Sequence, residues 1–258
     1  MGSGLVDIGG HPTWLSVDGD HDETVLLMHG GLSGSEALLG SIGPALRSRF
    51  QVAAFDRRGH GRTPDTEAPF HYATMADEAV AVLEHLGRPG HLVGWSDGGN
   101  VGLLVALRRP DLVRRLVVIG SNYHHSGLRP LAGLDAVMPA VRAAYGDVSP
   151  DGIDHFAAIV AKTTEMFLSE PTLTTADLGG IACPVLVLVG DDDMIDLGHT
   201  CTMYESIPNA QLAVVPGTSH ALPLERPAEC GAIITRFLTV ELPVETYMPS
   251  RRSDVARA

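Results

Sequence analysis

The sequence predicts an α/β fold: a mostly parallel, doubly wound sheet with a small helical cap. Short apolar runs rich in β-branched residues alternate along most of the chain with segments of helical spacing. Such near-continuous apolar strands are typical of a parallel sheet that helices cover on both faces. One interval, residues 122–180, contains no convincing strand and is too long for a structureless connection, which predicts the cap.

Six runs are predicted as buried strands because each is short, apolar and bounded by turn residues. The first of them, Thr24–Met28, lies between acidic residues and the tripeptide H-G-G. Two alternating segments near the N-terminus, 6–8 and 11–17, are predicted as antiparallel edge strands. The six runs are residues 24–28, 51–55, 91–94, 113–120, 184–189 and 211–215.

The segments between these runs have helical spacing and are predicted to cover the sheet: 35–47, 75–86, 100–107, 199–206 and 227–237. Helix-like stretches at 134–145 and 153–168 fall in the strand-free interval. A length of 258 residues suits a single α/β unit. We therefore expect a core formed by residues 5–121 and 181–240, a cap at 122–180 and a flexible tail at 241–258.

The composition narrows the partners and the compartment. A net charge of -13 disfavours binding to nucleic acid or anionic lipid. The three cysteines are an odd number without metal-like spacing, which suits a reducing cytoplasm better than a disulfide framework or a zinc site. No apolar run approaches a membrane span, and the N-terminus lacks secretory-signal features. We expect a cytoplasmic protein with a small-molecule partner and no nucleic-acid or membrane partner; a homodimer stays open.

The motif G-W-S-D-G at residues 94–98 follows one predicted strand and precedes a predicted helix. A bare G-x-S-x-G is common, but this setting is the one that a nucleophile elbow requires. Glycines on both sides permit a strained turn that projects the serine hydroxyl above the sheet. Ser96 is therefore the predicted nucleophile.

Further segments carry a family resemblance. H-G-G at 29–31 follows a strand, and D-R-R-G-H-G-R at 56–62 follows the next one. With the elbow, these segments resemble the oxyanion loop and the D-x-R-G-x-G-x-S loop of the α/β-hydrolase superfamily, although Thr63 replaces the last serine. The chain is similar to valacyclovir-hydrolase-like and haloperoxidase-like esterases over about residues 11–240. The resemblance implies the α/β-hydrolase fold and a serine hydrolase.

A serine hydroxyl needs an adjacent base, and a carboxylate must orient that base. His220 follows the last predicted strand in a segment similar to the superfamily's catalytic-histidine loop. The superfamily pattern places the acid three residues after Gly190, which selects Asp193 and leaves Asp192 as the rival. Some relatives carry the acid one strand earlier, but Asn122 at that place offers only an amide.

An oxyanion hole needs two backbone N–H groups. Asp97, directly after the nucleophile, is one expected donor, and Gly31 is the other, with Leu32 as its alternative. The Asp97 side chain would also suit a cationic substrate amine, although acids are common in a first helical turn for other reasons. No nucleotide, phosphate or metal motif is present, so neither a cofactor nor a metal is expected. The candidate substrate-binding residues are Leu32, Trp95, Tyr123 and Met138.

The leading functional hypothesis is hydrolysis of a carboxylic ester, or a related acyl compound, through an acyl-enzyme on Ser96, as in a carboxylesterase. A cofactor-free haloperoxidase, a C–C bond hydrolase and a lactonase would use the same three residues. These alternatives stay open because the cap, rather than the reacting residues, selects the substrate. From another class, a ligand-sensing receptor on a hydrolase scaffold also stays open.

Overall fold

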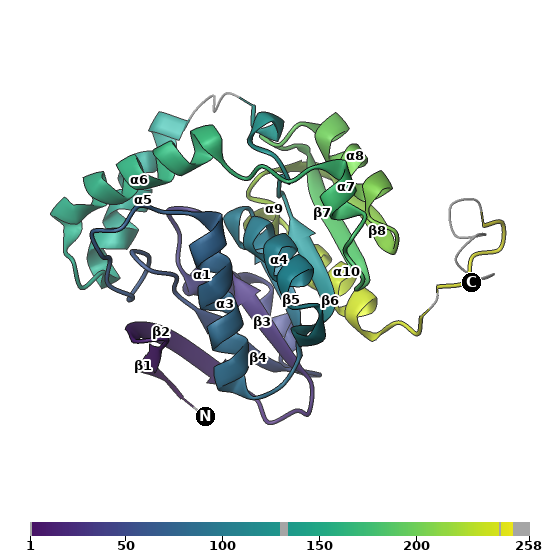
Figure 1. The fold of residues 1–258 in the computed structure, drawn as a ribbon, viewed down its shortest axis with the longest axis horizontal. Helices are drawn as coiled ribbons and strands as arrows, with labels where there is room; N and C mark the ends of the chain where they lie inside the picture. The colour runs from purple at the N-terminus through teal and green to yellow at the C-terminus, as the bar shows by residue number, and fades with distance from the viewer. Residues whose placement is uncertain (1, 130–133, 243, 250–258) are drawn as a thin grey trace.

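The computed structural model describes residues 2–129, 134–242 and 244–249, in which a central sheet is covered by helices on both faces (Figure 1). The strand order is β1-β2-β4-β3-β5-β6-β7-β8. β1 and β2 pair antiparallel at one edge, and β3 to β8 run parallel, which confirms the predicted sheet. The strands are β1 (Ser3–Ile8), β2 (His11–Asp18), β3 (Thr24–Met28), β4 (Gln51–Phe55), β5 (Gly90–Trp95), β6 (Val113–Ile119), β7 (Val185–Asp192) and β8 (Ala210–Ser219).

The strands differ from the predicted runs mainly at their ends. β1 begins at Ser3, before the expected edge strand and before the expected start of the core. β7 and β8 run past the glycine and proline that seemed to end them, because Asp192 pairs with Ser219 across the two strands. β6 ends before Gly120, whose φ of +54° departs from the strand.

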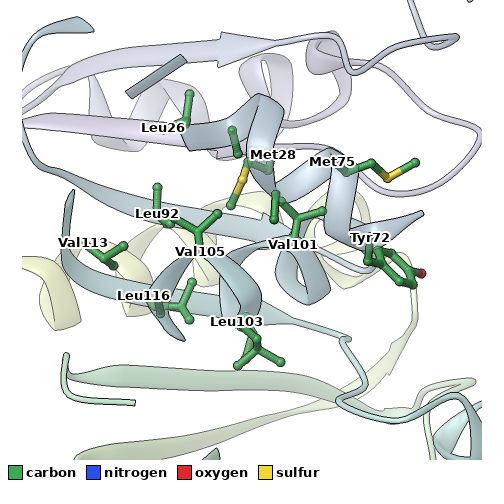
Figure 2. Close-up of a cluster of buried hydrophobic side chains, with 14 of the residues drawn as sticks. Leu26, Met28, Tyr72, Met75, Leu92, Val101, Leu103, Val105, Val113 and Leu116 are labelled. Carbon is green, nitrogen blue, oxygen red and sulfur yellow. The ribbon is translucent and has the colours of Figure 1, made fainter. Parts of the chain in front are cut away.

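Two helical layers cover the sheet. The apolar side chains of α1 (Ser35–Ser41), α2 (Gly43–Leu46) and α10 (Pro227–Thr239) join one core cluster, and those of α3 (Tyr72–Leu86), α4 (Asp97–Arg108) and α8 (Leu197–Ser206) join the other. Figure 2 shows the second cluster, where side chains of α3 and α4 meet those of β3, β5 and β6. The single helix expected at 35–47 is divided into α1 and α2, because the proline at position 44 fits only a first helical turn.

The interval between β6 and β7 contains α5 (Leu134–Val148), α6 (Phe156–Ser169) and the short α7 (Thr175–Leu178), with α5 and α6 side by side at the upper left of Figure 1. Asp65, in the loop after β4, ties this segment to the core: its Oδ2 lies 2.7 Å from Lys162 Nζ and 2.8 Å from His155 Nε2. Short α9 (Leu222–Glu225) precedes α10. Residues 130–133 of the expected cap, and 243 and 250–258 of the expected tail, lie outside the described residues.

Candidate active site

Ser96 lies between β5 and α4 in a strained conformation, with φ of 54° and ψ of -120°. A non-glycine residue adopts a positive φ only where its surroundings impose it. Here the neighbouring strand does so: the Ser96 N–H donates to the Ile119 carbonyl at 2.7 Å. The Ser121 hydroxyl donates to the Ser96 carbonyl at 3.0 Å. The elbow is therefore fixed from both sides, and sequence reasoning did not foresee the part of Ser121.

The structure brings Ser96, His220 and Asp193 together in a hydrogen-bonded chain. His220 Nε2 lies 2.9 Å from Ser96 Oγ, and His220 Nδ1 lies 2.8 Å from Asp193 Oδ1. The Ile195 N–H donates to the same Asp193 oxygen at 2.9 Å. Asp193 is buried, whereas its rival Asp192 is exposed at the end of β7. The geometry thus favours Asp193 as the partner of His220.

Two further residues shape the His220 environment. The indole N–H of Trp95 donates to the His220 carbonyl at 2.8 Å, which holds the histidine loop beside the elbow. Gly120 has a φ of +54°, and a Cβ there would lie 2.9 Å from Asp193 Oδ2 and 3.0 Å from His220 Nδ1. Glycine is required at this position for both reasons. In the sequence, the only indication that position 120 needs glycine is that it directly follows an apolar strand run.

The two residues predicted as oxyanion donors lie against each other. A Cβ on Gly31 would come within 2.6 Å of Asp97 Oδ2, so the close approach depends on glycine. The next residue, Leu32, has a φ of 55°, which makes the whole loop tightly turned. Gly31 and Leu32 both line the cavity above Ser96.

The Asp97 carboxylate is buried in a polar cluster rather than exposed to the cavity. The Tyr72 hydroxyl donates to Asp97 Oδ1 at 2.7 Å, and Arg57 Nη2 lies 3.9 Å from Asp97 Oδ2. Burial raises the pKa of Asp97, while Arg57 and the Tyr72 hydrogen bond oppose that rise. Burial, reinforced by Asp97, raises the pKa of Tyr72 well above its ordinary value. Tyr72 and Arg57 were missed from the sequence because both lie far from Asp97 along the chain.

A cavity of about 1150 Å³ opens above Ser96 and His220, and residues of α5 and α6 form part of its lining. Of the candidate substrate-binding residues, Leu32, Trp95 and Met138 line it. Tyr123 is not among the residues that line it: its ring stacks on His199 at a centroid distance of 4.0 Å, beside a hydrogen bond from its N–H to His199 Nε2. Most lining side chains are apolar, among them Leu128, Val137, Val141, Ala144, Val148, Val160, Phe167, Leu168, Met194 and Leu224.

The two arginines among the described lining residues are already paired. Arg62 lies 3.1 Å from Glu36, and its guanidinium covers a tryptophan ring. Arg129 lies 2.6 Å from Asp196. An anionic substrate would have to displace a carboxylate to bind either one, so neither arginine offers a free site for an anion. In the described part of the chain, no cluster of three or more histidines, cysteines or acids is arranged to hold a metal, and no helix is long and apolar enough to span a membrane.

A serine–histidine–aspartate chain at the carboxyl edge of a parallel sheet, with the aspartate buried and the other two residues facing a cavity, is the arrangement of an α/β-type hydrolase. Comparison with known proteins agrees, since the family model for the alpha/beta hydrolase fold matches residues 23–165. The chain belongs to the α/β-hydrolase family.

Three relatives illustrate the similarity. A putative carbamate hydrolase, RutD, from a Caulobacter species is 30% identical over 85% of this chain and 92% of its own length. The human serine hydrolase BPHL is 26% identical over 92% of this chain and 86% of its own length. The meta-cleavage product hydrolase of Pseudomonas fluorescens superposes with a TM-score of 0.78 at 22% identity, covering 92% of this chain and 96% of its own. The last similarity shows the fold alone.

Proposed function

We propose that this protein is a cytoplasmic serine carboxylesterase that cleaves uncharged esters with a bulky apolar group through an acyl-enzyme on Ser96. The observation that carries the proposal is the 2.9 Å contact between Ser96 Oγ and His220 Nε2 beneath an apolar cavity. The relatives named as hydrolases support the general class. Three free cysteines support a reducing compartment.

The proposed mechanism follows from the contacts. His220 Nε2 accepts the Ser96 proton as Oγ attacks the ester carbonyl, and Asp193 stabilises the resulting imidazolium through Nδ1. The N–H groups of Gly31 and Asp97 donate to the oxyanion. His220 then gives its proton to the departing alcohol. Water, deprotonated by His220, attacks the acyl-enzyme. As the carboxylic acid departs, His220 returns that proton to Ser96 Oγ, which restores the hydroxyl.

The cavity supports the substrate class. Its volume of about 1150 Å³ exceeds what a short acyl chain fills. Burying apolar surface of a ligand against the leucine, valine and methionine side chains around it contributes about 25 cal/mol per Å². We therefore expect kcat/KM to rise with acyl length from acetate to octanoate. Anionic compounds such as the dienoates of C–C bond hydrolases find no unpaired arginine among the described lining residues.

The first test compares Ser96→Ala with Ser206→Ala, the same change on α8, outside the cavity lining. Among the described residues, the Ser206 hydroxyl donates within its own helix, to the Thr202 carbonyl. We expect Ser96→Ala to lose p-nitrophenyl ester hydrolysis and labelling by a fluorophosphonate while keeping its folded circular dichroism spectrum. Ser206→Ala should keep both activities. Retained turnover or labelling in Ser96→Ala refutes the proposed nucleophile.

Carbamates are the second candidate substrate, because the relatives named as putative carbamate hydrolases reach 30% identity over most of the chain. A carbamate carbonyl is open to the same attack by Ser96. Aryl esters and aryl carbamates of the same alcohol distinguish the two substrate classes, since the leaving group is then constant.

Pre-steady-state mixing tests the alternative that the protein is a ligand-sensing receptor. One equivalent of acyl-enzyme followed by no turnover indicates a sensor, whereas continued product release indicates an enzyme.

A further inference from the structure

Arg57 is the largest fully buried side chain near the elbow, and its contacts converge on the peptide that would bind the oxyanion. Its Nη2 donates to the Gly30 carbonyl at 3.1 Å, and its Nη1 donates to the His29 carbonyl. The Gly30 carbonyl belongs to the same planar amide as the Gly31 N–H. Because that amide is trans, the N–H points opposite to the carbonyl that Arg57 holds.

A second donor fixes the same carbonyl. The backbone N–H of Arg57 donates to His29 Nε2 at 3.1 Å, so Nε2 is an acceptor and the ring proton of the neutral imidazole lies on Nδ1. That Nδ1 is 2.7 Å from the Gly30 oxygen and therefore donates to it. Burial, together with the charge of Arg57, lowers the pKa of His29 well below its ordinary value. The neutral tautomer is thus maintained.

The guanidinium also approaches the other side of the oxyanion site. Its Nη2 lies 3.9 Å from Asp97 Oδ2, an oxygen that has no hydrogen-bond partner among the described residues. Asp97 supplies the second proposed backbone donor, and its side chain presses against Gly31. One buried cation therefore contacts both segments of the proposed oxyanion hole.

We propose that Arg57 is a positioning residue that, with His29, orients and polarises the Gly30–Gly31 amide so that its N–H is aimed at the oxyanion. A charge-assisted bond to an amide oxygen withdraws electron density from the amide, which makes its N–H a stronger donor. The charge also contributes a preorganised positive potential where negative charge develops. This proposal rests on the acyl-transfer function proposed above.

The test compares Arg57 with its neighbour in the chain. Arg58 has the same side chain, but it pairs with Glu78 at 3.0 Å and makes no hydrogen bond to the oxyanion loop. We expect Arg57→Lys to lower kcat at least about tenfold with KM changed less than about threefold, because a lysine cannot replace the two-pronged contact. Arg58→Lys should keep kcat within about twofold of the parent.

A transition-state analogue distinguishes positioning from general damage. A trifluoromethyl ketone forms a hemiketal on Ser96 whose oxyanion would occupy the same hole. Its inhibition constant should rise in Arg57→Lys by about the factor by which kcat/KM falls, while inhibition by the product alcohol, which has no carbonyl or carboxylate oxygen for the hole, stays unchanged. Equal losses in both inhibitors, or equal kcat losses in the Arg57 and Arg58 variants, would overturn the proposal.

Two measurements keep the proposal testable if Arg57→Lys does not fold. The double variant Arg57→Met/Asp97→Asn removes both buried charges, so neither is left without a partner. Its kcat should still be lower than that of the single variant Asp97→Asn. In the unaltered protein, nitrogen-15 NMR should show His29 protonated only at Nδ1 from pH 6 to 9, and an Nε2–H tautomer would contradict the geometry. If Ser96→Ala remains active, the proposed function itself fails; if only the Arg57 results fail, the esterase proposal stands.

Discussion

Replacing Gly120 by alanine perturbs the proposed acid–base pair without touching either member. The added Cβ would lie 2.9 Å from Asp193 Oδ2 and 3.0 Å from His220 Nδ1, where ordinary contact begins at 3.4 Å. The two side chains must therefore withdraw by about 0.5 Å, the difference between 3.4 and 2.9 Å. Misplacing a reacting group by 1 Å costs about 100-fold in rate, so we expect kcat to fall about 10- to 100-fold. This equals about 1.4 to 2.7 kcal/mol of activation free energy.

The backbone adds a separate cost, because alanine at a φ of +54° destabilises the fold by about 1 to 2 kcal/mol. Gly87→Ala is the matched control: Gly87 has a φ of +74° at the end of α3, and a Cβ there meets nothing within 4 Å. Urea unfolding should show the backbone cost in both variants, and any further loss in Gly120→Ala reports the steric clash. Steady-state kinetics on p-nitrophenyl octanoate, with active sites counted by a fluorophosphonate, should show a kcat loss only for Gly120→Ala. Equal kcat values for the two variants would refute the steric argument.

Three further predictions follow from the site. Trp95→Phe removes the 2.8 Å bond to the His220 carbonyl, so kcat should fall about 3- to 10-fold and urea unfolding should show about 1 kcal/mol less stability; an unchanged kcat would mean that the loop needs no such anchor. An α-amino ester and its desamino analogue should have similar kcat/KM, because Asp97 is buried and faced by Arg57; a clear preference for the amine would contradict this. Burial lowers the pKa of His60 to about 3, so its neutral ring stabilises the fold above pH 6.5, and that contribution is lost as pH falls toward 3. In His60→Phe, the loss of unfolding free energy between pH 6.5 and pH 4, measured by urea unfolding, should be about 3 kcal/mol smaller than in the parent protein. An equal loss in both proteins would exclude His60 as its source.

Much of the fold was predictable because it depends on local patterns. Buried parallel strands are short and apolar, and the elbow, the aspartate loop and the histidine loop each follow one. Chain order then placed Ser96, Asp193 and His220 at one edge of the sheet. Strand ends were less predictable, since the pairing of Asp192 with Ser219 is a property of two strands together.

Side-chain environment was the harder inference. Tyr123 follows β6 at the start of the strand-free interval and looked like a pocket residue, but a histidine 76 positions away offers both a stacking surface and an acceptor. For the Asp97 side chain the sequence leaves two interpretations open, a partner for a substrate amine and an acid that only suits a first helical turn. Its contacts with Tyr72 and Arg57 favour the second, and neither partner is near it in the sequence.

For the adjacent arginines of the D-R-R-G segment, the sequence does not predict which side chain is buried. Both arginines lie beyond the end of β4, and Arg58 is already in a turn, so the side-chain alternation of a strand does not extend to them. Position alone does not say which one enters. The structure sends Arg57 inward to the Gly30 carbonyl and leaves Arg58 partly exposed beside Glu78. Arg57 occupies the unspecified position of the D-x-R-G pattern, so the resemblance assigns it no role. A buried charge is nevertheless stable only where acceptors are arranged for it. For Arg57 those acceptors are the His29 and Gly30 carbonyls of the oxyanion loop. We therefore infer that Arg57, and not the arginine that the family pattern specifies, positions this loop.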